Sequence, residues 1–529
     1  MSPNHDDRAS DDHVAGPGAH LDTARDAVSQ RWTGQWVSDR LHIAIETTIA
    51  PLGVYLEDLV GLAVRRNPRR AHLLVSTVLG KHLPTDPNLV YGSGLLLGGL
   101  VAQALTNKAS DPARRHRSGG DLLRLALAGT PRAAAMLTEY GLRDRATLGA
   151  RDGSGGVVVL GYAETATALG HVVADALNAP VLHSTRRLVA GVTPVGGFEE
   201  DHSHARSHLL LPEDPMLLAG SELLVLVDDE LSTGSTVFNT IIELHSLNPR
   251  ERYVVAALVD LRSDDDQAWL ANAAADLGAR IDVIALATGR VVLPEGIVAA
   301  GRDLVAQMEA SQAPVEYPKD VEASATVVTV AVPAPGGMRD GGRHGFYPSD
   351  REVLEAYLRD VAADVIAAIG PPASSGVHVL GFEELMYAPL RLAQVLSDQR
   401  HGYQVTFSTT TRSPVLAVDD AGYAIRSRVM LPAHDNPSDG PGPRFAYNLA
   451  LATSNRRFST LIVVIDETAD TPELRDAGGL LAQLASTLNA SAKVVVVVIP
   501  AYRPTNPASD GHPLPPPASP TVVPAGESL

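Results

Sequence analysis

The chain of 529 residues contains no cysteine. It therefore cannot form disulfides, thiolate zinc sites or cysteine nucleophiles, so any chemistry must use oxygen and nitrogen groups. Long apolar runs are also missing, since none reaches the roughly 18 to 20 residues that a membrane-spanning helix needs. The N-terminal stretch MSPNHDDRASDDH lacks the basic and apolar regions of a signal peptide. We expect a cytoplasmic protein that does not enter a membrane.

Basic residues are in deficit. Lys and Arg together number 43 against 61 Asp and Glu, which gives a formal net charge of −18. Affinity for nucleic acid depends on clustered Lys and Arg, so this balance argues against nucleic acid as a partner. A local basic pocket for a small anion remains compatible with it.

Composition divides the chain into two folded units. Residues 1–30 are polar and aperiodic and residues 503–529 are rich in Pro and Ser, so both are predicted to be disordered tails. Residues 311–348 are dense in Pro and Gly, which predicts a linker, although SATVVTVAV within them has the pattern of a strand. The units predicted on either side of it are residues 31–310 and 349–502.

Both units alternate strand patterns with helical patterns, for example GVVVLG before TALGHVVADAL and VHVLGF before APLRLAQVL. This alternation predicts α/β units with parallel sheets. Four pairs of segments correspond in the same order, among them HSTRRL with TTTRSP and ELLVLVDDE with TLIVVIDET. We interpret them as an internal duplication, the alternative being chance similarity between two α/β units.

Residues 223–236, LLVLVDDELSTGST, form the strongest candidate site. LLVLV predicts a buried strand and the following VFNTIIELH predicts a helix. The loop between them would offer backbone N–H groups and a helix N-terminus to a phosphate, and Gly234 allows close approach. Hydroxyl donors are supplied by Ser232, Thr233, Ser235 and Thr236.

Two carboxylates precede this loop. Asp228 and Asp229 would repel a phosphate, so we expect them to face sugar hydroxyls or a magnesium ion. A ribose 5-phosphate satisfies both halves of the motif. The simpler alternative is a capped helix after a strand, for which Asp, Ser and Thr are common choices.

An apolar strand followed by Asp-Asp and S-T-G-S-T resembles the phosphoribosyl pyrophosphate (PRPP) signature of type I phosphoribosyltransferases. The order of the other segments is similar to that of orotate phosphoribosyltransferase. The resemblance implies a Rossmann-like parallel sheet with a hood, magnesium-dependent transfer of ribose 5-phosphate from PRPP to a base-like acceptor, and a homodimer. It assigns Lys81 to a basic position and places Tyr162, Glu164 and Thr165 in the pyrophosphate loop.

Transfer from PRPP passes through an oxocarbenium-like state, so catalysis needs cations that neutralise the departing pyrophosphate. The predicted cations are Lys81, Arg186 and Arg187. Magnesium is expected at Asp228 and Asp229, held mostly through the substrate.

The chain departs from the orotate enzymes in the pyrophosphate loop, where Glu164-Thr165 replaces Tyr-Lys. Glu164 could hold magnesium or a cationic part of the acceptor, or it could be a solvated loop acid. Glu230 stands where an apolar residue is common, and we expect it to be tolerated at the surface. Metal binding, acid–base or phosphate contact, and plain exposure all stay open for three histidines of the predicted mobile loop, His202, His204 and His208.

The whole chain also resembles the two-domain proteins of tellurium-resistance (Ter) stress operons, in which an orotate phosphoribosyltransferase-like domain precedes a domain named for a TRSP motif. That motif stands at residues 411–414. Because Pro472 replaces the second half of the phosphate loop, the second unit is not expected to bind a 5-phosphate in the same way. An anion or nucleotide pocket, or a purely structural unit, stays open for its polar residues Thr411, Arg412, Ser413, Arg426, Arg428, Asp466 and Glu467.

Two functions therefore remain. The first is a phosphoribosyltransferase, favoured by Lys81 and the basic mobile loop. The second is a non-catalytic sensor of PRPP or a nucleotide, favoured by the missing lysine of the pyrophosphate loop.

Overall fold

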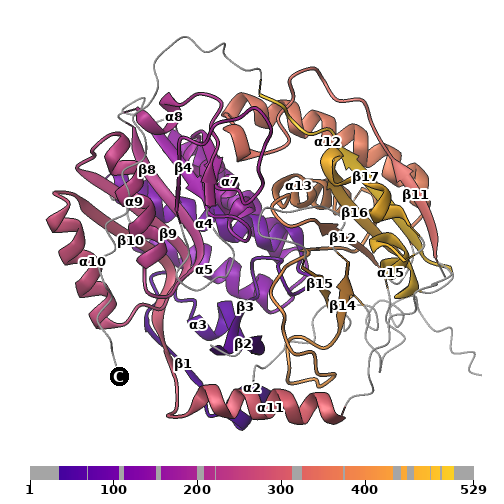
Figure 1. Cartoon of the computed structure of the whole chain (residues 1–529). Helices are drawn as coiled ribbons and strands as arrows, with labels where there is room; N and C mark the ends of the chain where they lie inside the picture. Colours follow the sequence, from indigo (N-terminus) through magenta and orange to yellow (C-terminus); the bar gives the residue numbers. More distant parts are fainter. Residues whose placement is uncertain are drawn as a thin grey trace, which may run out of the picture.

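In the computed structural model the chain forms two α/β units that lie side by side (Figure 1). The predicted tail at residues 1–30 and most of the one at 503–529 lie outside the described residues. The structure describes residues 35–67, 70–106, 112–149, 156–198, 208–220, 222–311, 325–372, 376–398, 400–432, 442–449, 458–476, 478–488 and 491–504.

The first unit is built on a six-stranded sheet with the order β1-β10-β9-β8-β4-β5. All neighbouring strands in it are parallel except β1 and β10, which confirms the predicted parallel α/β sheet. Its strands are β1 (Ala44–Ile49), β4 (Val157–Gly161), β5 (Val181–His183), β8 (Leu223–Leu231), β9 (Arg252–Asp260) and β10 (Arg280–Val292).

Burial explains why these strands read as continuous apolar runs. Eight of the nine residues of β9 are buried, as expected for a central parallel strand covered on both faces. Helices pack against the sheet and against each other (Figure 1). The helices that connect or cover these strands are α4 (Pro87–Thr106), α7 (Thr167–Leu177), α9 (Ser235–Leu247) and α10 (Asp264–Asp276).

Helix α4 corrects the expectation that no apolar run is long enough to span a membrane. It has the length and composition of a spanning helix, but 72% of its most apolar window is buried inside the protein. It packs on α6 (Ala133–Gly149) and α7, and a Cβ at Gly98 would lie only 2.3 Å from the Cβ of Ala176. A helix that is apolar on all sides is buried, and here its neighbours are other helices and the strands β9 and β10 of the same chain.

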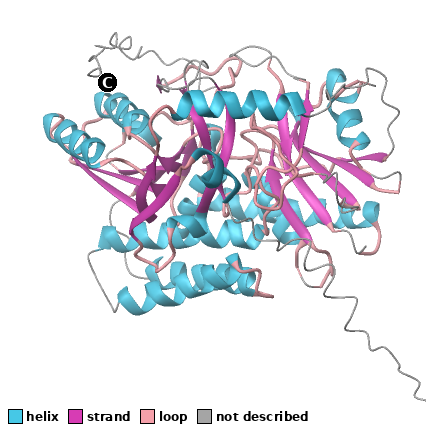
Figure 2. Ribbon diagram, turned by 90° about the horizontal axis from the view of Figure 1, so that it is seen from below, coloured by secondary structure: helices cyan, strands magenta, loops and turns pink. Residues whose placement is uncertain are grey.

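The second unit contains a five-stranded, entirely parallel sheet with the order β11-β17-β16-β12-β13. The edge strand β11 lies within residues 311–348, so the second sheet begins inside the range predicted as a linker. Figure 2 shows the two sheets beside each other, with helices above and below them. The strands are β11 (Thr326–Val330), β12 (Val377–Gly381), β13 (Val405–Thr409), β16 (Thr460–Asp466) and β17 (Lys493–Ile499).

Smaller elements complete the fold. Antiparallel pairs are formed by β2 (Val60–Asn67) with β3 (Arg70–Ser76), β6 (Gly196–Phe198) with β7 (His208–Leu210), and β14 (Arg428–Leu431) with β15 (Arg444–Tyr447). The other helices are α2 (Gln35–Leu41), α3 (Leu56–Leu59), α5 (Pro112–Leu127), α8 (Met216–Ala219), α11 (Ile297–Ser311), α12 (Pro348–Ile369), α13 (Tyr387–Leu396), α14 (Pro472–Arg475) and α15 (Leu480–Ser486).

The inferred duplication extends to individual hydrogen bonds. In the first unit the amide of Ala163 donates to Ser184 Oγ at 2.9 Å, and in the second the amide of Glu383 donates to Thr410 Oγ1 at 3.1 Å. The strand order β9-β8-β4-β5 also recurs as β17-β16-β12-β13. Aligned sequence segments therefore occupy equivalent places in two similar sheets.

The two units share a buried polar cluster on their helices. Asp175 of α7 accepts hydrogen bonds from Tyr91 of α4 at 2.7 Å and from Tyr387 of α13 at 2.8 Å, and it forms an ion pair with Arg351 of α12. All four side chains are buried. Since Asp175 belongs to the first unit and two of its partners to the second, this cluster ties the units together.

Candidate active site

The acidic pair lies at the carboxyl end of β8. The strand does not end at Val227 as the sequence suggested but continues through Asp228 and Asp229 to Leu231, because these residues pair with β9. Both carboxylates are half-buried, and the amide of Asp229 donates to Asp228 Oδ1 at 2.9 Å. The pair is thus fixed on a rigid element at the edge where parallel α/β sheets bind ligands.

The hydroxyl-rich loop follows directly. Gly234 adopts a left-handed conformation with φ of 88°, which glycine reaches without the strain of a side chain, and α9 begins at Ser235. The hydroxyls of Thr233 and Ser235 lie 3.0 Å apart. Ser232 and Thr236 are half-buried beside them. A turn of this kind at the N-terminus of a 13-residue helix has the form of an anion site.

The loop after β4 meets the acidic pair. Thr165 Oγ1 donates to Asp229 Oδ1 at 3.0 Å, so two segments predicted for the same ligand are in contact. Tyr162 behaves differently from the prediction, because its ring is buried and packs edge-on against Phe198 with centroids 5.3 Å apart. Its side chain belongs to the core rather than to the ligand-facing surface.

Glu164 is neither a solvated acid nor free to hold magnesium alone. Its carboxylate lies 3.1 Å from the guanidinium of Arg412, which comes from the second unit. Arg412 also forms an ion pair with Glu383 at 3.0 Å. The TRSP arginine therefore reaches the loop after β4 of the first unit, a contact between distant segments that no local pattern could predict.

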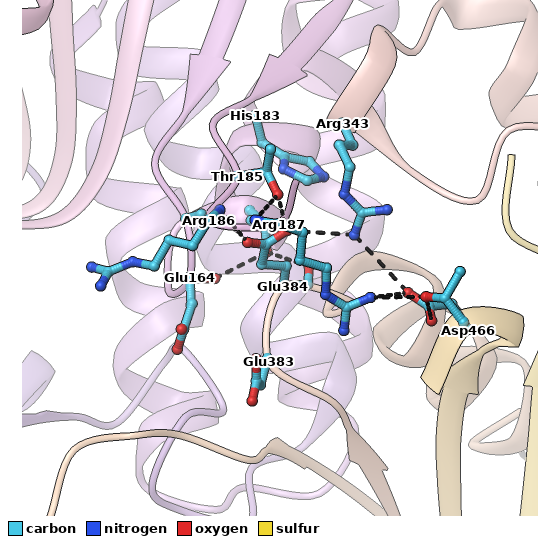
Figure 3. Close-up of polar contacts among 12 residues, drawn as sticks. Glu164, His183, Thr185, Arg186, Arg187, Arg343, Glu383, Glu384 and Asp466 are labelled. Carbon is cyan, nitrogen blue, oxygen red and sulfur yellow. Dashed lines mark hydrogen bonds and ion pairs between the residues drawn. The ribbon is translucent and has the colours of Figure 1, made fainter. Parts of the chain in front are cut away.

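The basic loop after β5 is held by the second unit. Arg187 Nη1 lies 2.6 Å from Asp466 Oδ2, and the amide of Arg186 donates to Glu384 Oε1 at 2.7 Å. Thr185 donates to the same carboxylate at 2.7 Å. Figure 3 shows the guanidinium of Arg186 extending away from Asp466, while that of Arg187 points toward it. The two predicted cations thus have different surroundings.

The carboxylates that hold this loop are buried among cations. Burial by itself raises the pKa of Glu384, but Arg343 and Arg187 outweigh it and lower that pKa to about 2. Asp466 follows the same logic, since Arg187 and Arg343 overcome the effect of burial and its pKa also falls to about 2. Both groups are therefore charged at neutral pH. Arg343 and Glu384 were not predicted from the sequence, although Glu384 aligns with Glu164 in the duplication.

We expect Glu384→Gln to destabilise the protein in a pH-dependent way. The ordinary pKa of Glu384 is 4.5 and its folded pKa is about 2, so its contribution is complete above about pH 4.5 and is lost as the pH falls toward 2. The free energy of unfolding of the wild type should exceed that of the variant by the widest margin near pH 7. Urea unfolding at pH 7, 5 and 3 measures this margin, and an equal margin at all three values would contradict the expectation.

Glu230 is not the tolerated surface residue that we expected. It is half-buried on β8, opposite Val259 of β9. Burial and the charge of Asp229 raise its pKa to about 7, against the opposing charges of Lys81, Arg70 and Arg65. Lys81 thus lies close enough to the acidic end of β8 to act on it, together with two arginines of the β2–β3 hairpin.

The other residues predicted for a second-unit pocket have partners within their own unit or are exposed. Arg426 pairs with Asp419 through Nε at 2.8 Å, and Arg428 lies over the ring of Phe445. Thr411 is buried, Ser413 donates its amide to Thr411 Oγ1 at 3.2 Å, and Glu467 is exposed. Of the predicted set, Arg412 and Asp466 form ion pairs with the first unit, to Glu164 and Arg187.

A small polar cavity lies beside these ion pairs. It is lined by His171, His183, Arg343 and Glu384 among others, and about 10 Å³ of it is open to the centre of a water molecule, roughly one water. Of the predicted mobile-loop histidines, His202 and His204 lie outside the described residues. His208 is buried, with Nδ1 2.9 Å from Ser184 Oγ, which gives it a structural place.

Comparison with known proteins agrees with this arrangement. Residues 59–290 match the family described as phosphoribosyl transferase, which makes the first unit a phosphoribosyltransferase. Residues 340–484 match the family described as the TRSP domain C-terminal to it. The chain therefore belongs to the proteins that join a phosphoribosyltransferase domain to a TRSP domain, and it is an enzyme of PRPP-dependent transfer.

Solved structures of the same class are similar only at low scores. Adenine phosphoribosyltransferase from Trypanosoma brucei, in complex with AMP, pyrophosphate and ribose 5-phosphate, is 13% identical with a TM-score of 0.21, over 30% of this chain and 68% of that one. The Rhodothermus marinus enzyme is 18% identical with a TM-score of 0.21, over 28% and 80%. Leishmania donovani UMP synthase is 17% identical with a TM-score of 0.18, over 42% and 44%. No curated protein matches the chain.

Proposed function

We propose that the first unit transfers ribose 5-phosphate from PRPP to a base-like acceptor at the carboxyl end of β8. One observation carries this proposal: Asp228 and Asp229 stand between the hydroxyl-rich turn of α9 and Thr165 of the β4 loop. A ribose that donates hydroxyl hydrogens to the acids would have its 5-phosphate at the turn and its pyrophosphate at the β4 loop.

The surrounding side chains support specific roles. Ser232, Thr233, Ser235 and Thr236, with Gly234, would bind the 5-phosphate through hydroxyl and backbone donors. Lys81 and Arg186 would neutralise the pyrophosphate with their positive charges. Arg187 would contribute indirectly, because its guanidinium is committed to Asp466.

The donor set suits magnesium bound mainly through its substrate. Within the described residues no group of three or more His, Asp or Glu side chains is placed to hold a metal. Asp228 and Asp229 offer oxygen ligands alone, and magnesium is commonly held by one or two carboxylates together with substrate phosphates. When bound, it would neutralise charge on the departing pyrophosphate.

The proposal also covers the pathway in which the enzyme acts. The base-like acceptor is unidentified, and the resemblance to Ter stress operon proteins suggests a nucleotide-like pathway linked to stress or tellurium resistance. We propose that the reaction takes place in the cytoplasm and that the enzyme forms a homodimer. Size-exclusion chromatography with light scattering tests the last point.

The decisive experiment measures the release of pyrophosphate from PRPP in the presence of magnesium, with a panel of nucleobases and cell metabolites as acceptors. Release that depends on one acceptor and stops on adding EDTA supports the transferase. Binding of PRPP without release from any acceptor supports the sensor instead, which is favoured by the missing lysine of the β4 loop, where Glu164-Thr165 replaces Tyr-Lys. Absence of PRPP binding excludes both.

A further inference from the structure

A row of polar contacts crosses from the first unit to the second at the loop after β4. Asp229 accepts a hydrogen bond from Thr165, and the preceding residue, Glu164, pairs with Arg412 at 3.1 Å. Arg412 then pairs with Glu383 at 3.0 Å. Arg412 therefore stands close to the residues proposed to face the ribose and pyrophosphate, although it belongs to the other unit.

The guanidinium of Arg412 is held by Glu383, which lies in a buried part of the second unit. Glu383 is buried, with a left-handed φ of 50° and its amide bonded to Thr410 Oγ1. Its carboxylate also pairs with Arg444, which is 1% exposed. Since buried paired charges are costly to separate, this support fixes where Arg412 can lie.

Arg412 supplies a positive charge where the loop itself has none. A carboxylate at position 164 would by itself repel a departing pyrophosphate, and the guanidinium beside it neutralises that charge. Arginine has five N–H donors in a planar fork that suits two phosphate oxygens at once. The side chain is 18% exposed, so a ligand at the loop can reach it.

We propose that Arg412 is a pyrophosphate-binding residue of the site on the first unit, and that Glu383 positions it while Glu164 pairs with it until the ligand binds. The TRSP motif then completes the transferase site rather than forming a pocket of its own. This inference rests on the proposed function of that site. A bound diphosphate carries more negative charge than Glu164 and replaces it beside Arg412, while Glu383 keeps the guanidinium in place.

The test compares affinities of the full chain for inorganic pyrophosphate and for magnesium–PRPP by calorimetry. Arg412→Ala should weaken both on the order of tenfold to a hundredfold, and Arg412→Lys less, because the charge remains but the fork is lost. Arg400→Ala, on an exposed turn of the same unit, is the matched control and should change neither affinity. In Glu164→Lys/Arg412→Ala the introduced lysine can pair with Glu383 and should restore most of the affinity.

Several outcomes overturn the proposal. One is a folded Arg412→Ala protein that binds pyrophosphate and PRPP as tightly as the wild type. Another is a loss of affinity that the lysine of Glu164→Lys/Arg412→Ala does not restore, since Arg412 would then act only in packing. If Arg412→Ala does not fold, Arg412→Lys with unchanged affinities overturns it. Asp228→Asn/Asp229→Asn separates the two levels: if that variant binds PRPP as tightly as the wild type, the proposed function fails, whatever Arg412 does.

Discussion

Replacing both carboxylates at the end of β8, in Asp228→Asn/Asp229→Asn, should lower kcat/KM for pyrophosphate release by at least about a thousandfold. In the proposed function the carboxylates accept hydrogen bonds from ribose hydroxyls and help hold magnesium, and an amide has neither the charge nor the second acceptor oxygen. Both acids are half-buried on a strand, so the variant keeps the shape of the site while losing its charge. The assay is initial-rate pyrophosphate release at several magnesium concentrations.

Asp466→Asn is the informative comparison for that variant. Asp466 aligns with Asp228 in the duplication, but it is buried and paired with Arg187. The loss of the Asp466 carboxylate should lower the free energy of unfolding, and it should lower the activity per folded molecule much less than the loss of the two β8 carboxylates does. Equal losses of activity per folded molecule in the two variants would show that the acids of β8 have no special part in the reaction.

Removing the carboxylate between the units should have the largest effect on stability. Asp175→Ala leaves the guanidinium of Arg351 and the hydroxyls of Tyr91 and Tyr387 buried without their acceptor. Breaking a buried ion pair from one side typically costs about 3 to 5 kcal/mol, so the free energy of unfolding should fall by about that amount. Equilibrium urea unfolding followed by circular dichroism measures it.

A surface pair provides the control. Glu46 pairs with Arg290 between β1 and β10, and both side chains are exposed. Glu46→Ala should change the urea midpoint little, because exposed ion pairs contribute little net stability. A midpoint for Asp175→Ala close to that of Glu46→Ala would mean that the cluster does not tie the units together.

Local patterns were sufficient for the elements of the site. The run LLVLV before two acids predicted β8, and the helical spacing of VFNTIIELH predicted α9. The C-terminal end of β8 was not predicted, because the strand is extended by the pairing of Asp228 with Ala257 of β9. Acidic residues in a sequence do not indicate such a pairing. The burial of the Tyr162 side chain was missed for a similar reason, since only the packed structure shows its ring against Phe198.

The partners of the charged residues were beyond any such pattern. Arg187 and Asp466 stand 279 positions apart, and nothing in either neighbourhood indicates the other. The same holds for Glu164 and Arg412. The alignment of the two halves gave a partial indication of the interface between the units. It paired Glu164 with Glu384, and both residues make contacts across that interface.

The sequence by itself determined the parallel α/β class and the acid-plus-hydroxyl motif, because both depend on residues that lie within a few positions of each other. It also determined the duplication, because similar segments recur in the same order in both halves of the chain. Only the tertiary structure decided that the carboxyl edges of the two sheets meet and that Arg412 and Arg187 each bind an acid of the opposite unit. Such pairings depend on how two finished sheets pack. That packing is set by buried surface and charge contributed from the whole chain.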